Sequence, residues 1–123
     1  MTYVDDAIKR LGSLQDGWFD GMGLAYTSAH LSRLQKLLKH LVAGTFNDPA
    51  VVPCSSGDVE VIWDVGQGRV VIYSSNDLDT VNICAVLNGT ECYSVDVSAA
   101  DLSGVTAAMD CAWQCLCDLA DTV

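Results

Sequence analysis

The feature that most constrains the fold is a two-residue alternation of apolar and polar side chains along the second half of the chain. Every second residue is apolar over 58–65, and the same pattern returns over 81–87 and 93–97. Alternation of this kind is typical of β-strands with one buried face. Glycine-containing turns separate the alternating segments, as in hairpins. The sequence therefore predicts an antiparallel meander of four strands, to which residues 50–54 can add a short fifth.

The first turn, Gly66-Gln67-Gly68, fits a three-residue hairpin loop whose last glycine is left-handed. Such a loop pairs Trp63 with Val71 and Val61 with Tyr73. Directly paired residues point to the same side of a sheet. We therefore expect all four of these side chains on the buried face.

Two segments ahead of the strands have the 3.6-residue period of amphipathic helices, over 4–15 and 29–43. Ser28 is the expected N-cap of the second helix, and Gly44 is its expected stop signal. The basic residues of this helix lie opposite its leucine stripe. The chain is therefore expected to begin with two helices.

A third helix is predicted over 99–120, where Ser98 and Asp101 resemble a capping box. Several faces of this helix are apolar, which favours burial on more than one side, between its own sheet and a second subunit. We expect one α+β domain over 1–123. It has two N-terminal helices, a four- to five-stranded antiparallel meander sheet, and a C-terminal helix packed on the sheet.

The charges are divided unevenly along the chain. Five of the six basic residues lie in the first 40 positions, whereas twelve of the sixteen acidic residues follow, so nearly all of the net charge of −10 lies beyond position 40. A negative field of this size opposes nucleic-acid binding and favours a basic protein partner. Adaptation to a salt-rich milieu is the alternative. Arg33, Lys36 and Lys39 are expected to pair with acidic residues of the same chain or of a symmetry mate.

Asp58, Glu60 and Asp64 share one face of a predicted strand. Neighbouring carboxylates on such a face lie about 7 Å apart, within the range of glycosidase pairs. A strand face offers no cleft, however, and a row of charges there also discourages edge-to-edge pairing. We interpret these residues as a solvated acidic face.

Four cysteines could converge if the last helix covers the second hairpin. The Leu87-Asn88-Gly89 turn places Cys84 opposite Cys92, and Cys111 and Cys115 lie one helical turn apart. Four thiolates can hold zinc, but such sites normally carry C-x-x-C pairs, which are absent here. Reduced packing thiols are therefore the main prediction, with a functional redox pair as an alternative, and no metal or cofactor is predicted.

Catalytic residues are not apparent in the sequence. His30 and His40, the only histidines, are both expected as surface or capping residues of the second helix. A cysteine nucleophile needs a histidine within hydrogen-bond reach, which this placement does not favour. We therefore predict no catalytic residue and favour a protein that is not an enzyme.

The glycine-rich segment 17–23 offers a different kind of site. It lacks the Lys-Ser/Thr of a phosphate-binding loop, but Trp18, Phe19 and Asp20 could line a small-molecule pocket with Trp63 as the opposite wall. A small-molecule-binding module or minor enzyme with this pocket, between the sheet and the loop, is the alternative function.

Two segments carry a resemblance to known proteins. Trp18 followed by Asp20-Gly21-Met22-Gly23 is similar to a Trp-Asp-Gly-x-Gly-Ala segment, and Pro53 followed by the 57–63 strand is similar to a Pro…Gly…Trp hairpin. The pair occurs in small bacterial and phage accessory proteins of unknown activity, often encoded on mobile elements and gene cassettes. The match covers about residues 10–75. It implies an α+β accessory protein and assigns no functional residue.

The leading functional prediction is a non-catalytic accessory protein with a strongly acidic surface that recognises a basic protein partner. The apolar last helix favours a homodimer, with Cys111, Cys115 and Asp118 at the interface. The N-terminus has early acidic residues and no apolar core of a signal peptide, and no apolar run approaches the length of a membrane span. We therefore expect a cytoplasmic protein that binds neither membrane nor nucleic acid.

Overall fold

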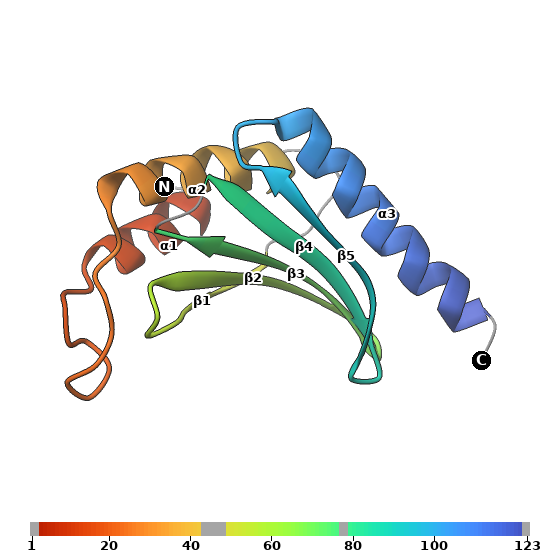
Figure 1. The fold of residues 1–123 in the computed structure, drawn as a ribbon, viewed down its shortest axis with the longest axis horizontal. Helices are drawn as coiled ribbons and strands as arrows, with labels where there is room; N and C mark the ends of the chain where they lie inside the picture. The colour runs from red at the N-terminus through yellow and green to blue at the C-terminus, as the bar shows by residue number, and fades with distance from the viewer. Residues whose placement is uncertain (1–2, 43–48, 77–78, 122–123) are drawn as a thin grey trace.

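The computed structural model describes residues 3–42, 49–76 and 79–121. Two helices precede a sheet of five antiparallel strands in sequence order, and a third helix follows it (Figure 1). The elements are α1 (Tyr3–Gly12), α2 (Ser28–Val42), β1 (Ala50–Pro53), β2 (Asp58–Val65), β3 (Gly68–Ser75), β4 (Thr80–Leu87), β5 (Thr90–Ser98) and α3 (Leu102–Asp121). The predicted α+β architecture is confirmed, including the fifth strand.

All three helices lie on one side of the sheet, here called the covered face (Figure 1). Its strand residues are almost fully buried: Val59, Val61, Val70, Ile72 and Ile83 are all 0% exposed. Each helix contributes one apolar stripe to the same core. In the described ranges, no helix lies on the opposite side, here called the uncovered face.

The first hairpin turn is one residue shorter than predicted. Val65 pairs with Gly68, so only Gly66 and Gln67 form the turn. Gly66 has a φ of 59°, which suits the first position of a two-residue turn that follows the strand twist. The expected pairing of Trp63 with Val71 is therefore wrong.

The pairs observed in this hairpin are Trp63 with Val70 and Val61 with Ile72. A register change of one residue exchanges the two faces of a strand. Val71 and Tyr73 consequently point to the uncovered face.

The second hairpin combines a two-residue turn with a bulge. Asn88 (φ 52°) and Gly89 (φ 81°) form the turn, as expected for an Asn-Gly pair. The register shifts between Ala85 and Val86, so Cys84 pairs with Ser94 and not with Cys92. The shift keeps the predicted inward residues of both strands on the covered face.

Side chains cap the two longer helices. The Thr27 hydroxyl accepts from the His30 backbone amide (3.1 Å), so Thr27 caps α2 in place of the predicted Ser28. The Asp101 carboxylate accepts from the Gly104 amide (3.0 Å), so α3 begins later than predicted. Gly44, the expected stop signal, lies outside the described residues.

Helix α3 buries a single stripe within this chain. Val105, Met109 and Ala112 are fully buried, whereas Cys111 and Cys117 on the other side are exposed. The contact with a second subunit stays a prediction. None of the helices, within the residues described, is both long and apolar enough to cross a membrane.

Candidate functional site

The uncovered face gathers acidic side chains from two strands, β2 and β5. Register fixes which residues share this face, because directly paired residues point to the same side. Asp58, Glu60 and Asp64 therefore lie together on β2, as predicted. Through successive pairs across β3 and β4, this face also includes two carboxylates of β5, Glu91 and Asp96.

One basic side chain offsets these five carboxylates among the described residues of this face. The Arg69 Nε atom lies 2.9 Å from an Asp64 carboxylate oxygen, so the pair neutralises itself. Asp96 is held by a neutral donor instead, the Asn82 side-chain amide at 2.9 Å. The face therefore retains the charge of four carboxylates.

The centre of the uncovered face is apolar. Val71 and Cys84, which pair across β3 and β4, are only 3% and 2% exposed although no described helix lies over them. Ile62 and Val86 are half-buried around them, and the Tyr73 ring is 38% exposed. An apolar centre with a charged rim is the arrangement of many protein interfaces.

A shallow pocket of about 180 Å³ lies at one end of this face. Asp58 and Asp96 contribute carboxylates to it, Asn82 an amide, and Tyr73 an aromatic ring. An aromatic residue and two acidic residues in one pocket suit the ammonium or guanidinium end of a basic side chain.

Cys84 and Tyr73 in the same region remain in their neutral forms. Burial raises the pKa of the Cys84 thiol, and the negative charge of Glu91 adds to this effect. Burial likewise raises the pKa of the Tyr73 hydroxyl. A thiol held in this form is a poor nucleophile. The region therefore suits binding better than covalent catalysis.

The basic stripe of α2 is largely satisfied within the chain. The Lys39 Nζ atom lies 3.0 Å from an Asp5 carboxylate oxygen, and Arg33 approaches Asp79 at 3.9 Å. The predicted pairing with acidic residues of the same chain is thus observed for two of the three stripe residues. These pairs involve none of the carboxylates of the uncovered face.

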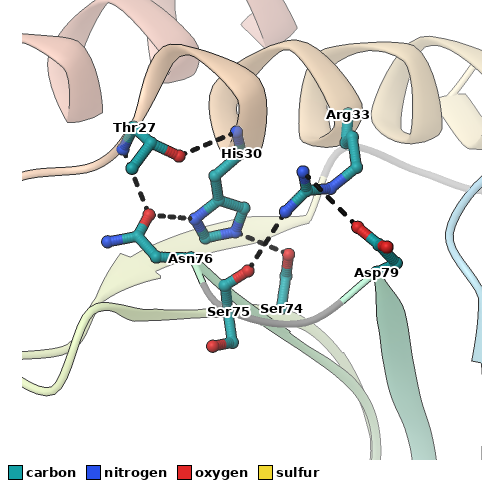
Figure 2. Close-up of polar contacts among 7 residues, drawn as sticks. All are labelled: Thr27, His30, Arg33, Ser74, Ser75, Asn76 and Asp79. Carbon is teal, nitrogen blue, oxygen red and sulfur yellow. Dashed lines mark hydrogen bonds and ion pairs between the residues drawn. The ribbon is translucent and has the colours of Figure 1, made fainter.

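His30 is fully buried, which contradicts its predicted surface position. It lies in the first turn of α2, and its ring points to the end of β3 (Figure 2). The Asn76 amide donates to the Ala25 carbonyl (3.0 Å), so its oxygen faces the His30 Nδ1 atom at 2.8 Å. Nδ1 therefore carries the proton, and Nε2 accepts from the Ser74 hydroxyl at 2.6 Å.

The Ser74–His30–Asn76 chain has the connectivity of a hydrolytic triad, but it is closed to substrate. His30 is 0% exposed and Ser74 is 7% exposed. Burial lowers the pKa of His30 and keeps the ring neutral. We interpret the chain as a buried polar link that holds α2 on the sheet. Its sequence signal was the position of His30 one turn before Leu34, in the apolar stripe of the helix.

The 17–23 loop is folded upon itself. Its Trp18 Nε1 donates to the Leu24 carbonyl (3.1 Å), and the indole ring lies so close to Gly23 that a β-carbon there would be 2.8 Å from Nε1. Asp20 is exposed with a left-handed φ of 51°. Phe19 points outward with 58% of its surface exposed.

Trp63, the other predicted wall of a small-molecule pocket, lies in the core and is 4% exposed. The structure thus places it in a different environment from Trp18, which remains half-buried within its own loop. The predicted ligand site at these residues stays a prediction.

The four cysteines considered for zinc do not converge. Cys84 faces the uncovered side, whereas Cys92 and Cys115 meet at the contact between β5 and α3. Within the residues that the structure describes, no group of three or more metal-ligating side chains comes together. Of the predicted interface residues, Cys111 and Asp118 are exposed and Cys115 is half-buried.

Comparisons of the chain with protein-family models, with curated proteins and with solved structures gave no match. The resemblance over about residues 10–75 therefore stays a prediction, and function must be inferred from geometry and charge.

Proposed function

We propose that the protein is a non-catalytic binding protein whose uncovered face receives a basic segment of a partner protein. The observation that carries this proposal is the charge of that face, where five carboxylates are offset by Arg69 alone among the residues described. Charge complementarity speeds encounter and selects among partners. The partner is therefore a segment in which arginine or lysine surrounds an apolar side chain.

The geometry of the face supports this kind of occupant. Ile62, Val86 and the Tyr73 ring give an apolar surface for a hydrophobic residue. The pocket at Asp58 and Asp96 suits a basic one. A partner that matches both features gains apolar burial at the centre and ion pairs at the rim.

The 17–23 loop, together with Leu24 directly after it, provides an apolar border beside this face. Phe19, Met22 and Leu24 are 58%, 67% and 51% exposed, the highest values among the described large apolar residues. Paired backbone hydrogen bonds between Phe19 and Met22 hold the loop in a fixed shape. Leu24 lies against Gly57 in the turn before β2, next to Asp58. A partner on the uncovered face can therefore also contact the loop.

Binding of a short peptide that contains both arginine and leucine tests the proposal. The double variant Glu60→Gln/Glu91→Gln removes two charges from the uncovered face. We expect its affinity to fall roughly fivefold to tenfold, as about 1 kcal/mol of screened ion pairing is lost. Fluorescence anisotropy at low and physiological salt measures the change, and added salt should reduce the difference.

The matched control is Asp6→Asn/Asp110→Asn, which removes two exposed charges from the helices. This variant should bind the peptide as tightly as the natural protein. Equal losses of affinity in both double variants would show that the peptide responds only to the net charge of the protein, and would contradict a defined site. Absence of peptide binding by the natural protein at low salt would also overturn the proposal.

A small-molecule-binding module or minor enzyme remains the second proposal. Trp18 and Trp63 lie in separate environments, which counts against the predicted pocket between them.

A homodimer is also proposed, from the exposed outer side of α3. Light scattering at increasing concentration measures the mass of the particle, and a monomer at high concentration would contradict the dimer.

A further inference from the structure

The bulge in β5 changes where Cys92 points. Ala85 pairs with Tyr93 and Val86 pairs with Glu91, so Cys92 has no partner across the hairpin. Alternation would place Cys92 and Tyr93 on opposite faces, yet both pack against the core. A bulge sets two residues of one strand against one of the other and redirects the side chain. Cys92 is thereby turned toward the helical layer.

Helix α3 brings a second thiol to this point. The Cys115 thiol donates to the Cys92 carbonyl oxygen at 3.3 Å, and the Cys92 thiol donates to the Ala85 carbonyl at 3.5 Å. Burial raises the pKa of Cys92, and the neighbouring Cys115 thiol raises it further. Cys115 on α3 therefore lies against Cys92 on β5, although the two residues are 23 positions apart in the sequence.

The remaining cysteines lie elsewhere. Cys84 points to the uncovered face, Cys111 and Cys117 are exposed on α3, and Cys54 follows β1. A disulfide needs two β-carbons about 4 Å apart, so neighbouring thiols have a strong advantage over distant ones. Among the six cysteines, Cys92 and Cys115 are joined by a direct contact, from the Cys115 thiol to the Cys92 carbonyl oxygen.

We propose that Cys92 and Cys115 form an oxidation site that closes into a disulfide with a low-molecular-weight disulfide such as oxidised glutathione. One cysteine thiolate attacks the glutathione disulfide, whose S–S bond breaks and releases one glutathione thiol. The second thiolate then displaces the second glutathione and forms the protein disulfide. Two electrons and two protons pass from the protein to glutathione. The inference is independent of the proposed partner binding.

The site has a chemical consequence and a structural one. Because burial holds the Cys92 thiol protonated, oxidation should be slow at neutral pH and faster in mild alkali. The new bond would tie α3 to β5, restrict the unfolded chain and raise the melting temperature by several degrees.

The test treats the reduced full-length protein with oxidised glutathione, alkylates the remaining thiols and maps the peptides by mass spectrometry. We expect a peptide pair joined through Cys92 and Cys115, with four cysteines alkylated. A stable glutathione adduct on either residue, a different joined pair, or alkylation of all six cysteines would overturn the inference. The natural protein alone decides this, so the result does not require a variant to fold.

Variants then confirm the assignment. Cys115→Ser should abolish both the joined peptide and the rise in melting temperature. Cys111→Ser is the matched control, one turn away on the same helix but exposed, and it should retain both. If Cys111→Ser abolished the joined peptide and Cys115→Ser did not, the disulfide would involve Cys111 and the proposed site would be wrong.

Discussion

The two faces of the sheet come from the same strands but differ in composition, most clearly along β2. On the covered face, β2 contributes Val59 and Val61, both fully buried. On the uncovered face, the same strand contributes Asp58, Glu60 and Asp64. Burial under the helices favours aliphatic side chains, and each fully buried one contributes about 1.5–3 kcal/mol. The uncovered face is free of that constraint, so its charge is better explained by solvation or by a partner.

Polar groups on the covered face are tolerated only where they are paired. Among the described residues, His30 and Ser74 are the buried polar side chains, and they bind each other. Asn76 completes the pairing from the end of β3. A buried polar group without a partner would cost about 1–3 kcal/mol. This network therefore joins α2 to the end of β3 by hydrogen bonds, whereas the rest of the covered face is held by apolar packing.

The largest expected effect on the free energy of unfolding comes from truncating an apolar side chain, and the comparison uses one such side chain on each face. Ile83→Ala should lower the free energy of unfolding by about 2–5 kcal/mol, because it leaves a cavity under the helices. Ile62→Ala, from the half-buried centre of the uncovered face, should cost only about 1 kcal/mol. Urea denaturation measures both. Equal losses would break the comparison and would show that the uncovered face is covered in solution.

A smaller effect is expected from the buried histidine. His30→Gln should lower the free energy of unfolding by about 1–3 kcal/mol at neutral pH, because the paired ring nitrogens are lost. It should also change the response to acid. Burial lowers the pKa of His30 in the folded state, so the unfolded chain binds more protons as the pH falls below its ordinary value of about 6.5. The natural protein therefore loses the stability that the neutral His30 ring contributes as the pH falls below about 6.5.

Chemical denaturation between pH 7.5 and about pH 5 tests the sign of that effect. The slope of stability against pH should become shallower in His30→Gln. His40→Gln, at an exposed position that contacts Thr106, is the matched control, because it removes the other histidine and leaves the buried network intact. An unchanged slope in His30→Gln would mean that the ring does not remain neutral when the chain folds.

Much of the fold follows from the sequence because period and turn residues are local signals. Alternation over 58–65 predicted a strand, and the glycine turns predicted hairpins. The exact register did not follow, because two- and three-residue loops both fit Gly66-Gln67-Gly68. The structure has the two-residue turn. This difference of one residue in turn length decides whether Val70 or Val71 faces the core.

The site residues were predictable only in part, for a related reason. The acidic face of β2 follows from alternation alone. Its extension to Glu91 and Asp96 depends on pairing across three strands, which local pattern does not supply. The burial of His30 depends on partners more than forty positions away, Ser74 and Asn76. The bulge at Cys92 had no sequence signal beyond the turn that precedes it.

The smallest expected effect concerns the carboxylates themselves. If their only role is solvation, removing two of them should change folding stability very little. Glu60→Gln/Glu91→Gln should raise the free energy of unfolding by less than about 0.5 kcal/mol at low salt, through reduced repulsion, and the gain should vanish at high salt. Asp64→Asn is the informative control, because it breaks the pair with Arg69 and should give no gain. A marked loss of stability in the double variant would make these carboxylates structural. A negligible change in the free energy of unfolding together with weaker peptide binding would separate folding from recognition. The charge of these carboxylates would then be explained by the partner that it attracts, because it contributes nothing to folding.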